Sequence, residues 1–235
     1  MEEAVTNPVQ KPQDVDTSMR VVVTPAPVRR QVAEIIRSAI TSGRFAPGQR
    51  LIEKDLCEMT GVSRPSVREA LRQLETDGLI EVIPNKGPSV ARLTRDDAAG
   101  IYQVRGALEA LAAQSFASVA TDAEVAQLRS AVEALKQAYA TQNVEQILVA
   151  KHAFYQVLFD GAGNPTIPAL LRTLTDRITL LRRVTLSSPQ RGAASLAEID
   201  VILEAIERRD AAGAHAATLH HINEASKSAL QALDP

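Results

Sequence analysis

The sequence predicts a mainly α-helical protein in two parts, a winged helix-turn-helix followed by a six-helix antiparallel bundle. Residues 61–92 combine a short turn, a helix with a basic face, and two short extended runs around a glycine-bearing tip. That order is typical of a winged helix-turn-helix, which has three helices and a two-stranded wing. From Thr94 onward, apolar residues recur only at helical spacing and the breaks between periodic segments are short, which favours an antiparallel helical bundle.

The composition narrows the class of protein. The chain has 235 residues, of which 45% are apolar, enough for two packed domains. No apolar run approaches the length of a membrane span, and the polar N-terminus lacks an apolar signal segment. We therefore expect a protein that stays in the cytoplasm and has no membrane partner. The single cysteine, Cys57, excludes an intrachain disulfide framework.

Composition also divides the chain. Residues 1–24 are rich in proline and acids and are predicted to form a mobile N-terminal tail. Residues 25–93 form the predicted winged helix-turn-helix and residues 94–235 the helical part. Basic residues outnumber acidic ones across 20–94, whereas acidic residues outnumber basic ones across 95–235. This asymmetry is expected when only the N-terminal part meets phosphates.

The N-terminal part is predicted to hold three helices and a hairpin. The helices span Pro27–Thr41, Glu53–Met59 and Arg64–Asp77. Ser63 caps the third helix, and Pro65 is tolerated in its first turn. The strands span Leu79–Ile83 and Pro88–Leu93, with residues 85–87 as the hairpin tip.

The C-terminal part is predicted to hold six helices. They span Arg95–Val119, Asp122–Thr141, Val144–Asp160, Pro165–Leu186, Ala194–Arg209 and Ala211–Leu233. Thr94 caps the first of them, and Asn164 followed by Pro165 suits the start of the fourth. Gly192 and Asp210 mark breaks between helices.

Three arginines lie one turn apart on the predicted third helix. Arg64, Arg68 and Arg72 share a face about 100° away from the apolar face of Val67 and Leu71. An arginine forms two hydrogen bonds with the O6 and N7 atoms of guanine. The three side chains are therefore candidate DNA contacts; the alternative is a solvated face whose charges pair with nearby glutamates.

Further candidate DNA contacts flank this helix: Lys54, Ser66, Lys86 and Gly87. Ser66 and the first-turn amides suit phosphate oxygens. Lys54 and Lys86 could border the groove, and Gly87 lets the wing backbone approach the sugar-phosphate chain closely.

The segment LIEKDLCEMTGVSRPSVREALRQLETDGLIEVIPNKGPSV resembles the DNA-binding domain of the GntR superfamily of bacterial transcription regulators. The helical remainder, with IYQVRGALEALAA and DGAGNPTI, is similar to the FadR-like branch with its all-helical FCD effector domain. The resemblance implies a homodimer that binds a palindromic operator and releases it when a small metabolite binds. It assigns effector binding and dimerisation to residues 94–235. It also implies that Lys54, Arg64, Arg68 and Gly87 occupy DNA-contacting positions.

Many domains of this branch hold a divalent metal with one aspartate and three histidines. The resemblance places residues that do not suit the metal at three of these positions: Lys151, Tyr155 and Ile199. Only His221 remains, and one ligand cannot hold a transition metal. We therefore expect no metal and no other cofactor; a rearranged site using His152 or His220 is the alternative.

Arg105 and Lys151 lie near the centres of apolar helical stripes, where unpaired charges are costly. In a structural interpretation, Glu109 pairs with Arg105 and Lys151 extends to the domain edge. In a functional interpretation, which we favour, both cations bind a carboxylate or phosphate of an effector and Tyr155 donates a hydrogen bond. His221 lies on a face of small residues, which leaves room either for such a ligand or for a close helix neighbour. A satisfied core histidine is the alternative, and only the family resemblance favours the ligand.

These features predict a ligand-responsive DNA-binding regulator, a repressor that a small anionic metabolite releases from its operator. The partners would be double-stranded DNA, a small organic anion and a second copy of the chain. An activator, or a protein-binding adaptor without metabolite control, is the alternative. No Ser/His/Asp set, carboxylate pair or phosphate loop supports an enzyme.

Overall fold

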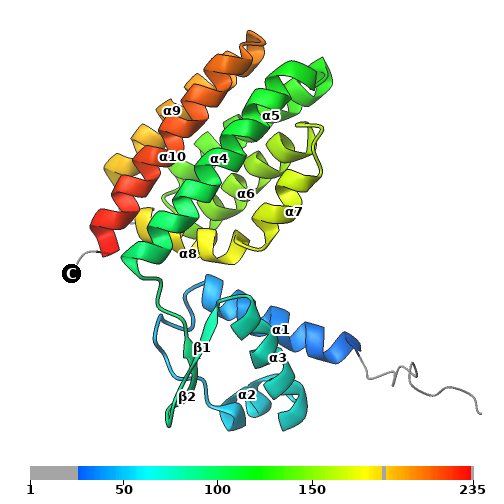
Figure 1. Ribbon diagram of the computed structural model, residues 1–235, viewed down its shortest axis with the longest axis vertical. Helices are drawn as coiled ribbons and strands as arrows, with labels where there is room; N and C mark the ends of the chain where they lie inside the picture. The colour runs from blue at the N-terminus through cyan, green and yellow to red at the C-terminus, as the bar shows by residue number, and fades with distance from the viewer. Residues whose placement is uncertain (1–25, 187–188, 234–235) are drawn as a thin grey trace, which may run out of the picture.

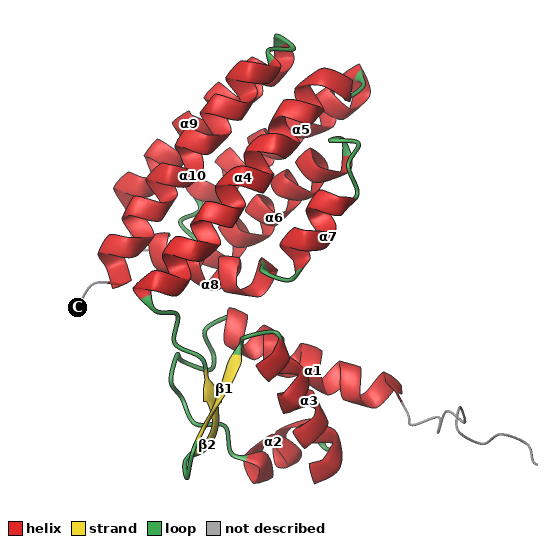
Figure 2. Cartoon of the chain, in the orientation of Figure 1, coloured by secondary structure: helices red, strands yellow, loops and turns green. Residues whose placement is uncertain are grey.

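The computed structural model describes residues 26–186 and 189–233, which form two parts stacked along the long axis of the molecule (Figure 1, Figure 2). The smaller part contains the wing, and the larger part is a helical bundle. The tail expected over residues 1–24 lies outside the described residues. None of the described helices combines the length and the apolar character needed to cross a membrane.

The smaller part has the predicted order of three helices and a hairpin. Its elements are α1 (Ala26–Thr41), α2 (Glu53–Thr60), α3 (Arg64–Thr76), β1 (Ile80–Ile83) and β2 (Gly87–Val90). Ile36 of α1, Val67 and Leu74 of α3, and Leu79 before β1 are buried together in one apolar core. The strands are antiparallel, with Ile80 opposite Val90. Helical spacing in α3 therefore places one face in the core and leaves the opposite face to solvent.

The larger part is a bundle of seven described helices. They are α4 (Arg95–Val119), α5 (Asp122–Ala140), α6 (Val144–Asp160), α7 (Thr166–Arg172), α8 (Thr175–Thr185), α9 (Pro189–Glu207) and α10 (Ala211–Leu233). The hydroxyls of Thr94 and Thr121 accept hydrogen bonds from the third-residue amides of α4 and α5, and both form capping boxes. Local sequence therefore fixes where these two helices begin.

The prediction of one helix over Pro165–Leu186 is wrong, because the chain breaks between α7 and α8. Thr173 ends α7 and Leu174 precedes α8 with φ −110° and ψ −7°. The hydroxyls of Thr173 and Thr175 donate to the carbonyls of Leu170 and Leu171. Such hydroxyl-to-backbone bonds compete with regular helix, and β-branched threonines have low helix propensity. The break raises the helix count of the bundle from six to seven.

Gly192 was expected to mark a break, but it lies within the first turn of α9. A Cβ atom at this position would lie 3.1 Å from Cε1 of Tyr139, so glycine permits close packing of α9 against α5. Gly106 plays a similar part in α4, where a Cβ would lie 3.2 Å from Cδ1 of Leu219 on α10. Gly192 and Gly106 thus allow neighbouring helices to pack closely and do not end helices.

Candidate DNA-binding surface and effector cavity

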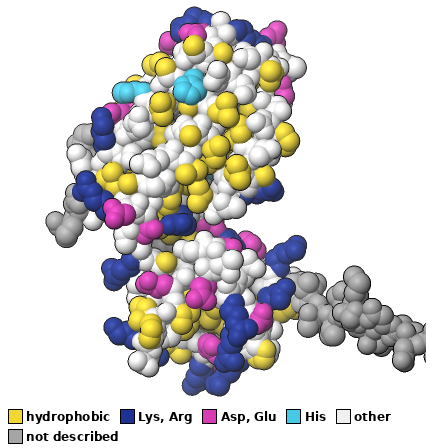
Figure 3. Space-filling view, in the orientation of Figure 1, with side chains coloured by type: hydrophobic (Ala, Val, Ile, Leu, Met, Phe, Trp, Pro, Cys, Tyr) yellow, Lys and Arg dark blue, Asp and Glu magenta, His cyan; other side chains and the backbone are white. Residues whose placement is uncertain are grey.

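The outer face of α3 carries the three predicted arginines. Arg64, Arg68 and Arg72 are exposed, while Val67 and Leu71 of the same helix are buried. Figure 3 shows lysine and arginine side chains gathered at the lower end of the N-terminal part, the region of α2 and α3. Nothing in the described structure covers this face. It presents a basic surface that a major groove could accept.

Arg68 is held in place by a carboxylate of the preceding helix. Its Nε and Nη2 atoms donate to Glu53 Oε1 and Oε2 at 3.0 and 2.9 Å. The hydrogen bond from Arg68 lowers the pKa of Glu53, so the carboxylate stays charged. Arg72 pairs with Glu69 at 2.6 Å, whereas no ion pair links Arg64 to any described residue. Arg64 is therefore the arginine whose binding to a base would break no ion pair in this structure.

The remaining candidates lie around α3. The hydroxyl oxygens of Ser66 and Ser63 lie 3.1 Å apart, and Ser63 occupies the cap position without a capping hydrogen bond from its side chain. Lys54 is exposed at the start of α2, and Lys86 is exposed at the wing tip. Gly87 has φ +79° and open space around its Cα. These positions agree with the predicted contacts, which stay predictions.

The helical bundle encloses a small cavity lined by all four predicted effector residues, Arg105, Lys151, Tyr155 and His221. Its volume is about 20 Å³, which is room for about one water molecule. Helices α4, α5, α6, α8, α9 and α10 all contribute side chains. An organic ligand would therefore need either a side-chain movement or an adjoining space.

Arg105 and Glu109 form a fully buried ion pair on α4. The Nε atom of Arg105 donates to Glu109 Oε1 at 2.8 Å, and Nη2 donates to Oε2 at 3.3 Å. Burial alone would lower the pKa of Arg105, but the charge and hydrogen bond of Glu109, together with the nearby Tyr155 and Tyr102, outweigh burial and raise that pKa. The pairing expected in the structural interpretation is therefore present. Nη1 of Arg105 nonetheless has no hydrogen-bond partner.

Lys151 does not extend to the domain edge, so that part of the structural interpretation is wrong. The side chain is buried, and Nζ donates to Ser195 Oγ on α9 at 3.0 Å. Burial, followed by the charges of Arg182 and Arg105, lowers its pKa well below the ordinary value. No carboxylate of a described residue pairs with Lys151. Within the described part of the chain, the protein therefore has no negative charge next to this amine that would stabilise its charged, ammonium form.

His221 belongs to a second buried polar group. Its Nδ1 atom lies 2.6 Å from Oε2 of Glu198, and Arg191 holds the same carboxylate through two contacts of 2.8 Å. Burial, and then the charge of Lys151, lower the pKa of His221 to about 4 despite the contact with Glu198. His221 is therefore neutral at pH 7. It is partnered inside the protein, as a satisfied core histidine would be.

Arg182 is one of the cavity residues that the sequence analysis missed. Its guanidinium carbon lies 4.3 Å from the centre of the Tyr155 ring, and its side chain forms no ion pair or hydrogen bond with a described residue. Burial and the charge of Arg105 lower its pKa. The sequence did contain a signal for an inward-facing Arg182, because Arg182 follows the buried Ile178 by four residues and so shares its helical face.

Arg191, Ser195 and Glu198 were missed for a different reason. They lie at helical spacing on α9, whose predicted start at Ala194 left Arg191 outside the helix. The start at Pro189 brings all three onto a shared side of α9, where Ser195 meets Lys151 and Glu198 meets His221.

Comparisons with known proteins identify both parts of the chain. The family model for bacterial regulatory proteins of the gntR family matches residues 28–90, and the FCD domain model matches residues 100–224. HTH-type transcriptional regulator YdhC of Bacillus subtilis (strain 168) is 31% identical over 201 residues, 85% of this chain and 89% of that protein. The chain belongs to the GntR family. It is a helix-turn-helix transcription regulator with an FCD domain, of the FadR-like branch.

Two further similarities support the assignment to the GntR family. HTH-type transcriptional repressor RspR of Escherichia coli (strain K12) is 28% identical over 209 residues, 87% of this chain and 90% of that protein. The solved structure of a GntR transcriptional regulator from Rhodococcus sp. RHA1 aligns with TM-score 0.77 and 25% identity, covering 88% of this chain and 99% of the other. The family consists of transcription regulators and not of enzymes.

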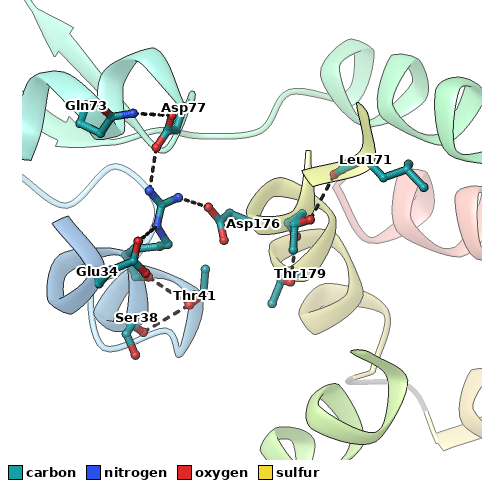
Figure 4. Close-up of polar contacts among 10 residues, drawn as sticks. Glu34, Ser38, Thr41, Gln73, Asp77, Leu171, Asp176 and Thr179 are labelled. Atoms are coloured by element: carbon teal, nitrogen blue, oxygen red, sulfur yellow. Dashed lines mark hydrogen bonds and ion pairs between the residues drawn. The ribbon is translucent and has the colours of Figure 1, made fainter. Parts of the chain in front are cut away.

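In this GntR protein, one arginine of the DNA-binding part contacts both parts of the chain (Figure 4). Arg37 of α1 donates to Asp77, which follows α3, at 2.7 Å, and also to Asp176 in the first turn of α8. Arg183 of α8 donates to the carbonyl of Thr41 at 3.0 Å. Leu180 of α8 packs against the apolar core of the DNA-binding part. Helix α8 therefore contacts the DNA-binding part at three places and carries Arg182 into the effector cavity.

Proposed function

We propose that this GntR regulator is a repressor that binds a palindromic operator as a homodimer and is released by a small anionic metabolite, a carboxylate. The observation that carries the anionic assignment is the charge balance of the cavity. Two carboxylates, Glu109 and Glu198, pair with Arg105 and Arg191. Lys151 and Arg182 remain without a carboxylate partner among the described residues.

An anion would relieve this imbalance. Two like charges in a low-dielectric cavity are costly, and the charge of Arg182 lowers the pKa of Lys151. The cavity also holds buried polar atoms without hydrogen-bond partners: Nη1 of Arg105 and the hydroxyls of Tyr102 and Tyr155. All three can donate to an oxygen. A ligand that brings negative charge and acceptor oxygens therefore fits what this cavity lacks.

The donor set favours an effector bound without a metal. A carboxylate and imidazoles hold a divalent ion in related domains, whereas Lys151, Tyr155 and the buried Ile199 occupy three of those positions here. Ammonium, phenol and alkyl groups do not replace such ligands, and no group of three or more candidate ligands occurs among residues 26–186 and 189–233. A cation in place of an acid changes the site from one that attracts metal to one that attracts anions.

The outward face of α4 supports a dimer. Beyond its first turn, the exposed residues of α4 carry no charge: Gly100, Gln103, Val104, Ala107, Leu111, Gln114, Ser118 and Val119. The exposed and charged Arg95 and Asp96 lie in the first turn. Val104 and Leu111 are 45% and 41% exposed at a spacing of two turns. Figure 3 shows apolar side chains across the bundle face on which α4 lies. An uncharged helical stripe with large apolar residues suits a self-complementary interface.

Helix α8 offers the route from the cavity to DNA. An anion that draws Arg182 inward would bias the position of α8, which is tied to the DNA-binding part through Asp176, Leu180 and Arg183. Two arrangements of that contact would hold the two α3 helices of a dimer at different separations, and only one would match successive major grooves. The effector needs to bind one arrangement better than the other.

The test combines DNA binding with ligand titration. Operator fragments selected from genomic DNA would be measured by fluorescence anisotropy with and without a set of di- and monocarboxylates. The proposal expects salt-sensitive binding to a palindrome and release by at least one carboxylate, and it expects Lys151→Met to abolish release without loss of operator binding. Specific DNA binding with no response to any small anion would favour the alternative without metabolite control. Absence of specific DNA binding would favour the adaptor.

A further inference from the structure

A second space adjoins the effector cavity on the side of α6, α7 and α8. It measures about 290 Å³, whereas the inner cavity measures about 20 Å³ on the same scale. A cavity of about 150 Å³ is large enough for benzene, so the outer pocket, unlike the inner cavity, has room for an organic molecule. The exposed side chains of His152, Gln156 and Arg172 lie at its lining, so it opens to solvent.

The inner cavity and the outer pocket share two side chains, Tyr155 and Arg182. Because Arg182 donates no hydrogen bond to a described residue, its guanidinium is available to a ligand in the outer pocket. Glu109 also reaches this pocket, but its carboxylate is engaged by Arg105. The inner end of the outer pocket therefore combines a free guanidinium with a neutralised carboxylate, and it favours an acid group.

One side of the outer pocket is apolar. Phe159 of α6, Leu171 of α7 and Ile178 of α8 line it, and the rings of Tyr155 and Phe159 lie with their centres 5.7 Å apart. A ligand made only of acid groups would leave these apolar side chains in contact with water. A compact hydrocarbon or aromatic group would cover them and gain from burial.

We propose that the outer pocket is the binding site for the organic part of the effector, a monocarboxylate with a compact apolar body whose acid group binds Arg182. This inference rests on the proposed anionic effector and adds where the ligand lies and what its uncharged part must be. The ligand would touch α7 and α8 directly. It would thus act on the helix that contacts the DNA-binding part.

The test uses the full-length protein and three probes of this class, benzoate, phenylacetate and hexanoate, measured by thermal shift and titration calorimetry. Benzyl alcohol lacks the charge and malonate lacks the apolar body, so these two serve as comparison ligands. We expect at least one of the three probes to bind at least about tenfold more tightly than either comparison ligand, the effect of a 1.4 kcal/mol difference.

Gln156→Trp fills the outer pocket from an exposed position on α6, and Gln146→Trp places the same ring on the same helix outside both spaces. We expect Gln156→Trp to abolish probe binding, Gln146→Trp to leave it unchanged, and Arg182→Gln to weaken it about tenfold or more. Circular dichroism would establish that each variant is folded.

Two results would overturn the inference: none of the three probes binds the parent, or the Gln156→Trp variant binds them as the parent does. If malonate released the operator and Lys151→Met prevented that release, the anionic effector would stand while the outer-pocket site would be rejected.

Discussion

Arg37 and Asp176 form an ion pair between α1 of the DNA-binding part and α8 of the FCD domain. The same guanidinium holds Asp77, the residue that ends α3. Burial opposes the charge on Arg37, but the hydrogen bond to Asp77 and the charge of Asp176 raise its pKa. A single side chain therefore links the end of α3, the predicted DNA-contacting helix, to the helix that carries Arg182.

Removing Asp176 should weaken the influence of the effector on operator binding more than it weakens operator binding itself. We expect Asp176→Ala to keep operator affinity within about threefold and to lose most of the effector's influence, which typically amounts to about 1–3 kcal/mol of coupling. Anisotropy titrations at zero and saturating effector measure both quantities. Asp200→Ala, which removes the exposed partner of Lys136, is the matched control. A parental effector response in Asp176→Ala would show that this ion pair transmits no signal.

Replacing Arg68 should reduce sequence discrimination. If Arg68 reads a guanine, Arg68→Ala loses about 1–3 kcal/mol of preference for the operator over random DNA. If Lys86 at the wing tip contacts phosphate, Lys86→Ala should instead weaken binding to all sequences and reduce the salt slope by about one. Competition titrations at several salt concentrations separate these outcomes. Equal losses on specific and random DNA in Arg68→Ala would contradict a base contact.

Replacing Lys151 should stabilise the protein and remove the effector response. The pKa of this buried amine is lowered, so the unfolded chain binds more protons than the folded one between the folded pKa and 10.5. Stability of the parent should therefore rise with pH through that interval. Lys151→Met should lack this rise and unfold at a higher temperature near pH 7. Lys227→Met, at an exposed lysine of α10, is the control; a lower unfolding temperature for Lys151→Met than for this control would contradict the charge argument.

Acid should destabilise the protein through His221. Its pKa is about 4 in the folded protein, where Glu198, Arg191 and Lys151 surround it, and about 6.5 when free. Below pH 6.5, His221 binds a proton in the unfolded chain but not in the folded protein, so the free energy of unfolding falls between pH 6.5 and 4. The loss is on the order of 3 kcal/mol at most. His221→Gln should flatten the unfolding temperature across this range, whereas replacing the exposed His220 with Gln should not.

A charge on the outer face of α4 should separate the proposed dimer. Leu111→Glu places a carboxylate in the uncharged stripe, where pairing of two copies would bury it. Sedimentation should show a monomer or a much weaker dimer, with weaker binding to a palindrome and unchanged helix content. Val149→Glu on α6, where Val149 is 70% exposed, is the control. Equal dimerisation of the two variants would place the interface elsewhere.

Local signals in the sequence predicted much of this fold. The capping threonines fixed where α4 and α5 begin, and helical spacing in α3 separated the exposed arginines from buried Val67 and Leu71. The same reasoning failed at residues 173–175, where no proline or glycine marks the break and side-chain bonds to the backbone end α7. A competition between two hydrogen-bonding patterns leaves little trace in apolar periodicity.

The order of residues by itself determined which side chains lie inward on each helix, because the 3.6-residue period assigns Arg105 and Lys151 to apolar faces. The i, i+4 spacing also offered Glu109 as the partner of Arg105, whereas the surroundings of Lys151 were decided only in the tertiary structure. Glu109 shares a helix with Arg105, but Ser195 meets Lys151 and Arg182 meets Tyr155 only where α6, α8 and α9 pack together. Charge balance in a cavity depends on every helix that lines it, and no single segment contains that information.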